Sequence, residues 1–169
     1  MKRTVIVAVA LTALVALPAA SWAQAKPDFS GTWKLDEAKS DPAPAGRGGG
    51  GGGGGRGGGA AATSMTIKQT AAQLSIDRVT GQGTQTALYK LDGSESVNKM
   101  GMGDSTSKAS WDGSKLVIAT SMTMQGPNGS MSMDSKEVYS LDGSVLTVET
   151  SRTTPMGAQN RRLVYSKGS

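Results

Sequence analysis

The sequence contains no cysteine and no histidine. A chain without cysteine forms neither disulfides nor thiolate metal sites, and a chain without histidine lacks the commonest general base and metal ligand. The nucleophiles that remain are serines and threonines. Ser105 and Lys108 have Ser-x-x-Lys spacing, but they fall within a predicted strand instead of opening a helix. We therefore expect a protein that is not an enzyme and carries no cofactor.

Long apolar runs are nearly lacking as well. The longest one covers residues 5–17, between the basic pair Lys2 and Arg3 and a segment of mostly small residues that ends in AQA at position 25. This order is typical of a cleavable secretory signal, and the run is too short to span a bilayer. We expect residues 1–25 to be removed, with the cut after Ala23 or Ala25. The protein is then expected to be periplasmic or secreted, with no stable membrane insertion.

A strong excess of charge is also missing, since the formal net charge is +5 and two of the positive charges lie in the signal. Such a mild excess fits weak attraction to anionic surfaces or ligands and does not require a nucleic-acid partner. The remaining residues, 26–169, are enough for one domain with its own core, and we expect a monomer.

One segment of this domain has almost no side chains to bury. Residues 42–62 read PAPAGRGGGGGGGGRGGGAAA. Glycine-rich segments lose the most backbone entropy on folding, so we expect a flexible insertion within the domain.

The rest of the domain consists of short runs rich in threonine, valine, isoleucine, tyrosine and methionine. Three connections between these runs carry Asp-Gly, at Asp92, Asp112 and Asp142, and Asp-Gly is typical of tight antiparallel hairpins. The sequence therefore predicts an all-β domain, an up-and-down antiparallel β-barrel of about 8–10 strands, with a two-sheet sandwich as the alternative. The predicted strands are 65–70, 73–79, 84–91, 105–111, 115–124, 130–141, 145–154 and 160–167.

The first strand, FSGTWKLD at residues 29–36, alternates so that Phe29, Gly31, Trp33 and Leu35 share one face. Its Gly-Thr-Trp resembles the Gly-x-Trp motif in the first strand of the calycins, the superfamily of the lipocalins and fatty-acid-binding proteins. The resemblance implies a secreted lipocalin-like barrel in which Gly31 and Trp33 close one end. It also implies that an arginine of the last strand packs across the tryptophan ring, and alternation favours Arg161.

The resemblance does not extend to every feature of these barrels. Fatty-acid-binding proteins have two short helices after the first strand, where this chain has the glycine-rich insertion. The Arg-x-Tyr of their last strand is absent too, because Leu163 stands two residues before Tyr165. Their fatty-acid site is therefore not transferred to this chain.

Alternation also predicts the interior face of the later strands, which carries two charged residues, Glu137 and Arg152. A buried charge needs a partner, so these two are expected to pair with each other or to contact a ligand. Together with Tyr139 and four methionines they form the candidate ligand site. The methionines are Met122, Met124, Met131 and Met133, which flank one predicted turn.

The preferred function is the binding of a small apolar or amphipathic molecule inside the barrel, since unbranched methionines line adaptable apolar sites. Two alternatives stay open. The Met-x-Met pairs could bind a soft metal ion such as Cu(I) or Ag(I), because thioethers suit soft cations. The barrel could also be a non-catalytic structural or interaction module of the cell envelope, with an interior filled by its own side chains.

Overall fold

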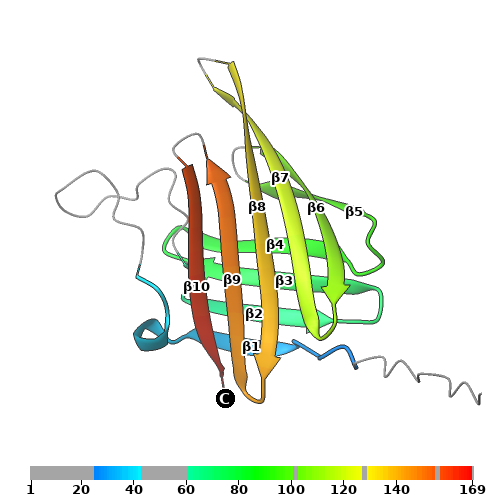
Figure 1. The fold of residues 1–169 in the computed structure, drawn as a ribbon, viewed down its shortest axis with the longest axis vertical. Helices are drawn as coiled ribbons and strands as arrows, with labels where there is room; N and C mark the ends of the chain where they lie inside the picture. Colours follow the sequence, from blue (N-terminus) through cyan, green and yellow to red (C-terminus); the bar gives the residue numbers. More distant parts are fainter. Residues whose placement is uncertain (1–24, 43–60, 101–102, 127–128, 155–156, 169) are drawn as a thin grey trace, which may run out of the picture.

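A computed structural model describes residues 25–42, 61–100, 103–126, 129–154 and 157–168 (Figure 1). The expected signal and most of the glycine-rich insertion lie outside these residues. Within the described part of the chain, no helix has the length and apolar character needed to cross a membrane.

Ten strands and one short helix make up the described chain. The helix is a 3-10 turn, η1 (Glu37–Lys39), that follows the first strand. The strands are β1 (Gly31–Leu35), β2 (Ser64–Gln69), β3 (Gln73–Thr80), β4 (Gly83–Lys90), β5 (Glu95–Met100), β6 (Gly103–Asp112), β7 (Lys115–Gly126), β8 (Gly129–Asp142), β9 (Val145–Thr154) and β10 (Gly157–Lys167).

The strands form one antiparallel sheet in the order β4-β3-β2-β1-β10-β9-β8-β7-β6-β5. The first strand pairs with the last, with Trp33 opposite Lys167, and every other pair in the ladder joins consecutive strands. Figure 1 shows the sheet curving round so that β1–β4 cross behind β6–β10. The prediction of an all-β, up-and-down barrel is confirmed.

The barrel closes between β4 and β5 through side chains instead of a backbone ladder. The Leu88 N–H donates to Asn98 Oδ1 at 2.8 Å, and Asn98 Nδ2 donates back to the Leu88 carbonyl at 2.9 Å. Beside them the Lys90 N–H donates to Ser96 Oγ at 2.8 Å. The Asn98 amide thus takes the place of a backbone amide of a neighbouring strand, and polar groups along this seam are satisfied.

Strand β5 was missing from the sequence prediction. Its buried positions are the polar Ser96 and Asn98, whereas Val97 between them is 67% exposed. The seam therefore inverts the usual alternation of apolar inside and polar outside, so the pattern that marks a strand in the sequence is absent here.

The three Asp-Gly connections are turns, and those at Gly113 and Gly143 form the predicted antiparallel hairpins. The turn at Gly93 joins β4 to β5, which stand at opposite ends of the sheet order, so the hairpin predicted there is wrong. Gly93, Gly113 and Gly143 have φ values of +84°, +60° and +57°, which are accessible to glycine at little energetic cost. These turns join β4 to β5, β6 to β7 and β8 to β9.

Buried aromatic residues pack together beside the first strand. Trp33 is 1% exposed, and its indole N–H donates to the Phe29 carbonyl at 2.9 Å. The Phe29 ring stacks on Trp111 with 6.1 Å between centroids and meets the Tyr139 ring edge-on at 6.2 Å. Gly31 has a φ of +138°, and a Cβ there would lie 3.1 Å from Lys167 Cε. The glycine therefore permits close approach of the last strand.

The expectation that Arg161 covers the Trp33 ring was wrong. The cation over this ring is Lys167, with Nζ 5.7 Å from the centroid. Register explains the difference, because Trp33 pairs with Lys167 and Arg161 lies six residues earlier on β10, about 20 Å along the strand. Arg161 instead donates from Nε and Nη2 to the Asp41 carbonyl, at 3.4 and 3.3 Å.

Candidate functional site: a polar network in the barrel interior

The interior of the barrel holds a cavity of about 250 Å³. Its wall is formed by inward-facing side chains of strands from both halves of the sheet, because alternation turns every second residue inward. The apolar part of the wall includes Met65, Met122, Val148 and Leu163. Val148 was on the face predicted to be interior, together with Leu116, Ile118 and Leu146, and all four are buried.

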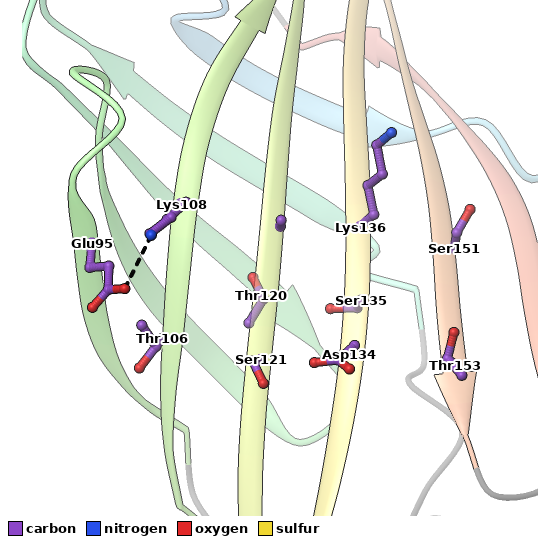
Figure 2. Close-up of a pocket in the computed structure, with 11 residues that line it drawn as sticks. Glu95, Thr106, Lys108, Thr120, Ser121, Asp134, Ser135, Lys136, Ser151 and Thr153 are labelled. Carbon is purple, nitrogen blue, oxygen red and sulfur yellow. Dashed lines mark ion pairs between the residues drawn. The ribbon is translucent and has the colours of Figure 1, made fainter.

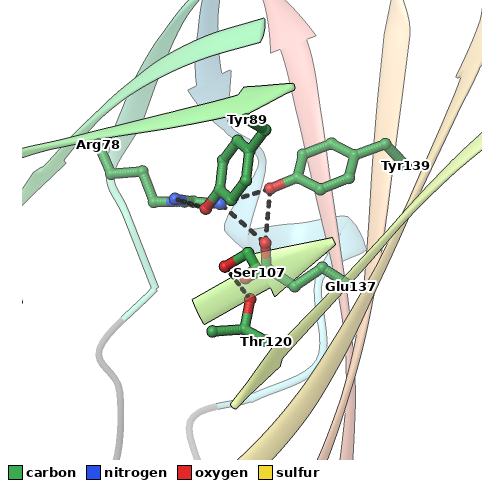
Figure 3. A network of polar contacts seen from close by, with 6 residues as sticks. All are labelled: Arg78, Tyr89, Ser107, Thr120, Glu137 and Tyr139. Carbon is green, nitrogen blue, oxygen red and sulfur yellow. Dashed lines mark hydrogen bonds and ion pairs between the residues drawn. The ribbon is translucent and has the colours of Figure 1, made fainter. Parts of the chain in front are cut away.

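One cluster of polar side chains converges inside this cavity (Figure 3). Arg78 on β3 reaches across the barrel, and its Nη2 lies 2.7 Å from Glu137 Oε2 on β8. The same Nη2 donates to the Tyr139 hydroxyl, which in turn donates to Glu137 Oε2 at 2.8 Å. Arg78 Nη1 donates to the Tyr89 hydroxyl at 3.4 Å. The four side chains form one network, which connects β3 and β4 with β8 across the barrel.

Beside this network the Ser107 and Thr120 hydroxyls share a hydrogen bond of 2.8 Å (Figure 3). Ser107 is 2% exposed, so its hydroxyl needs this partner. Hydroxyl groups thus continue the polar surface from Glu137 toward β6 and β7.

Burial and neighbouring charges shift the pKa values of Arg78, Tyr89 and Tyr139. Burial raises the pKa of Tyr139 well above its usual value and raises that of Tyr89 as well. Burial alone would lower the pKa of Arg78, but the negative charge of Glu137 together with the contacts to Tyr139 and Tyr89 outweighs this effect, so the pKa lies well above its usual value. At neutral pH both phenols are therefore protonated hydrogen-bond donors, and the guanidinium keeps its charge.

The cavity wall carries a net positive charge. Arg78, Arg152 and Arg161 line it, and Glu137 is the acidic residue among the lining residues. Arg78 and Glu137 offset each other, so the excess lies with Arg152 and Arg161 on β9 and β10. An anionic or strongly accepting group inside the cavity meets favourable electrostatics at these two residues.

The sequence prediction named several lining residues and left two roles open for Glu137 and Arg152. Their mutual ion pair is wrong, and their contact with a ligand stays a prediction. Glu137, Tyr139, Arg152 and Met122 all line the cavity. The ion-pair partner of Glu137, however, is Arg78, from a strand 59 residues away, and not Arg152. Met133 is half-buried and lies directly opposite Met122 in the register of β7 and β8, and Met131 lies opposite Met124.

Arg78 and Tyr89 were missed by the sequence analysis. Alternation in β3 carried the signal for Arg78, because Leu74 and Ile76 are buried on the same face. Tyr89 follows the buried Ala87 on β4 at the same spacing. Extending the interior face from the later strands to β3 and β4 would have found both.

A larger groove of about 460 Å³ lies on the outer face of β6–β9 (Figure 2). Short hydroxyl side chains such as Thr106, Ser121 and Ser151 form most of its lining. An exposed ion pair borders it, with Lys108 Nζ 3.3 Å from Glu95 Oε1. The groove is open to solvent, and its polar groups do not converge on one point. The interior cavity is therefore the better candidate site.

Oxygen and nitrogen ligands for a metal are not gathered in the described residues. No group of three or more aspartate, glutamate, histidine or cysteine side chains is placed there to hold a metal ion. The ion pair of Glu137 with Arg78 also makes this carboxylate a poor metal ligand.

Among known proteins, solved structures are similar to this one in fold. No protein family matches the sequence, and no curated protein is similar to it at a significant level. The solved structure of the REP1-NXSQ fatty acid transporter is similar in fold, with a TM-score of 0.51 and 12% sequence identity over 83% of this chain and 96% of that chain. The chain has a calycin-type fold.

Two other solved structures show a weaker similarity. The zebrafish ileal bile acid-binding protein complexed with cholic acid has a TM-score of 0.46 and 14% identity, over 62% of this chain and 72% of that chain. A secretary abundant heat soluble (SAHS) protein from Ramazzottius varieornatus has a TM-score of 0.47 and 12% identity, over 62% and 70%. Identities this low leave the ligand to be inferred from the cavity itself.

Proposed function

We propose that this calycin-type barrel is an exported, non-catalytic, monomeric carrier that binds one small amphipathic molecule in its interior cavity. The observation that supports the proposal is the combination of apolar side chains with one converged polar network around a single interior cavity. Ligand pockets likewise combine apolar side chains with placed polar groups, and the many polar residues of this wall favour an amphipathic ligand over a purely apolar one.

The cavity suits a small ligand. Its volume of about 250 Å³ lies just below the range of roughly 300–1,000 Å³ that is usual for ligand pockets. The apolar part of the ligand would contact Met65, Met122, Val148 and Leu163. Burial of this apolar surface would supply most of the binding free energy.

The polar group of the ligand is expected to be anionic. The Arg78 guanidinium is already neutralised by Glu137, so Arg152 and Arg161 remain to attract a negative charge. The Tyr89 hydroxyl can donate a further hydrogen bond to a carboxylate or phosphate oxygen. A cationic amphiphile would be repelled by the same two arginines.

Calorimetric titration with three amphiphiles of one chain length tests this proposal. Octanoate should bind most tightly, 1-octanol more weakly and octylamine least, and Arg152→Gln should weaken octanoate binding but leave 1-octanol binding unchanged. Thr150→Trp should fill the cavity and abolish binding of all three, because Thr150 lines it.

Ser151→Trp provides the matched control, since Ser151 is the next residue on β9 and lines the outer groove. If Thr150→Trp binds the amphiphiles as the unmodified protein does, the ligand does not occupy the interior. A complete lack of binding by a folded protein to all three probes, with no ligand mass in native mass spectra, would reject the carrier function.

A further inference from the structure

The polar network leaves part of its hydrogen-bonding capacity unused inside the cavity. Glu137 Oε2 accepts from Arg78 and from Tyr139, at 2.7 and 2.8 Å, whereas Glu137 Oε1 accepts no hydrogen bond from the described residues. The Tyr89 hydroxyl accepts from Arg78 Nη1 at 3.4 Å and donates to no other described residue. One carboxylate oxygen and one phenol proton therefore remain available.

The Tyr165 hydroxyl adds a second free donor. Tyr165 is 1% exposed and lines the cavity, and its hydroxyl has no hydrogen-bond partner within the described part of the chain. Every side-chain nitrogen or oxygen that is shut off from solvent in that part has a partner, so the free hydroxyl borders the open space of the cavity. Buried polar groups are normally hydrogen-bonded, and this one is free to bond to a group that enters the cavity.

The free groups face the same region of the cavity. Tyr89 and Glu137 bond to the two terminal nitrogens of one guanidinium, so the hydroxyl and the carboxylate lie beside each other on Arg78 (Figure 3). Burial raises the pKa of Tyr165 to about 12, and the charges of Arg78 and Glu137 also act on this hydroxyl, as expected for a group near the network. One acceptor and two donors are thus gathered there.

The geometry points to a subsite for a ligand hydroxyl, formed by Glu137, Tyr89 and Tyr165. A hydroxyl can donate to Glu137 Oε1 and accept from one of the phenols at the same time. The other phenol stays available to the anionic end of the ligand. A carboxylate in the subsite could not donate to Glu137 and would be repelled by it. An ammonium would meet the Arg78 guanidinium, which lies 2.7 Å from Glu137.

The subsite rests on the proposed carrier function, because it holds a second polar group of the same ligand. Glu137 lies opposite Thr150, and Arg152 is two positions further along β9, about 7 Å away along the strand. Arg152 lines the cavity and makes no ion pair with a described residue. The carboxylate of the ligand can therefore lie at Arg152 while its hydroxyl lies at the network. The ligand class is a hydroxylated amphipathic carboxylate.

Calorimetric titration with isosteric pairs of acids tests the subsite. The pairs are 8-hydroxyoctanoate with nonanoate and 6-hydroxyhexanoate with heptanoate, and in each a hydroxyl replaces a methyl group. In at least one pair the hydroxy acid should bind at least about tenfold more tightly, because a site that bonds to a hydroxyl discriminates against an analogue that lacks it. The cationic end of 8-aminooctanoate should make it bind less tightly than 8-hydroxyoctanoate.

Replacement of both charges tests the role of Glu137. Arg78→Met/Glu137→Leu removes the acceptor without leaving a lone charge, and it should abolish the preference for the hydroxy acid. Lys108→Met/Glu95→Leu is the matched control, because this exposed ion pair borders the outer groove. The control should keep the preference of the unmodified protein.

Tyr89→Phe/Tyr165→Phe tests the phenols and leaves the ion pair in place, so it remains decisive if the charge variant does not fold. It should reduce the preference by at least about fivefold. Equal affinities within both pairs of acids would overturn the subsite and leave the carrier function standing, whereas no binding of any acid to the folded protein would reject both. A preference that persists in the folded variants, or tighter binding of 8-aminooctanoate than of 8-hydroxyoctanoate, would also overturn the subsite.

Discussion

The side-chain amide of Asn98 on β5 bonds to both backbone groups of Leu88 on β4, accepting from its N–H at 2.8 Å and donating to its carbonyl at 2.9 Å. A residue of a paired strand makes the same two bonds with its own backbone. Asn98 is 7% exposed, and its backbone carbonyl also accepts from Ser105 Oγ at 3.2 Å. The Asn98 side chain therefore joins the two ends of the sheet, and its backbone carbonyl links this seam to β6.

Replacement of Asn98 by alanine should weaken this seam. The Leu88 N–H and carbonyl would lose their partner, and an unsatisfied buried polar group costs about 1–3 kcal/mol. Because Leu88 is 45% exposed, water replaces part of the lost bonding and the expected cost lies at the lower end of this range. We expect a lower free energy of unfolding and faster hydrogen exchange at the Leu88 amide. Val97→Ala is the control, because Val97 is 67% exposed on the same strand. Equal stability of the two variants would show that the seam does not hold the barrel closed.

Replacing one member of the Arg78–Glu137 pair should lower the free energy of unfolding far more than replacing both members together. Arg78→Met or Glu137→Gln leaves the partner charge or its hydrogen bonds unsatisfied inside the barrel. Loss of one member of a buried pair costs roughly 3–5 kcal/mol. The Arg78 and Glu137 side chains are 17% and 22% exposed, so the loss should be smaller than for a fully buried pair. We expect each variant to lower the free energy of unfolding by about 2–3 kcal/mol, measured by chemical denaturation.

The double variant Arg78→Met/Glu137→Gln should recover most of this loss, because no lone charge remains. The exposed pair Lys108–Glu95 offers a comparison within the chain, since its side chains are 61% and 59% exposed. Glu95→Gln should change the free energy of unfolding by less than about 1 kcal/mol. Additive losses in the double variant would mean that the network contributes through other contacts.

The tyrosines make the protein sensitive to alkali. The chain has three tyrosines, and burial raises the pKa of Tyr139 well above its usual value, that of Tyr89 less, and that of Tyr165 to about 12. Between the unfolded pKa of about 10 and the folded pKa, the unfolded chain binds fewer protons than the folded one, so stability falls as pH rises.

The expected loss is about 1.4 kcal/mol per pH unit for each tyrosine within its window. Phenolate absorbance and circular dichroism should therefore change together above about pH 10, when the barrel unfolds. Tyr165→Phe should make the fall in stability less steep. Phenolate formation near pH 10 with the circular dichroism of the folded barrel intact would contradict the burial of these hydroxyls.

Gly31 should tolerate no side chain. Its φ of +138° is one that residues with a Cβ rarely adopt, and strained backbone conformations of this kind cost about 1–3 kcal/mol. Gly31→Ala should lower the free energy of unfolding by that amount. Gly81→Ala is the control, because a Cβ at Gly81 meets nothing within 4 Å. Addition of Lys167→Ala separates the two causes, since it relieves the 3.1 Å approach but not the backbone strain.

Much of the fold was predictable from local patterns. Strand alternation and Asp-Gly turns depend on the backbone of a few neighbouring residues. The sequence alone therefore determined the hairpins at Asp112 and Asp142, the buried face of the first strand and the interior position of Glu137, Tyr139 and Arg152. The same local rule failed at β5, where Ser96 and Asn98 are buried to close the seam.

Only the tertiary structure decided which interior groups meet. Alternation says that a side chain points inward, but the partner across the barrel depends on register and curvature summed over many strands. For this reason Glu137 pairs with Arg78 and not with Arg152, and Lys167 covers Trp33 in place of Arg161. The sequence determined a β-barrel and many of its interior residues. The closure of the sheet determined which of the charged residues in the cavity pair with each other.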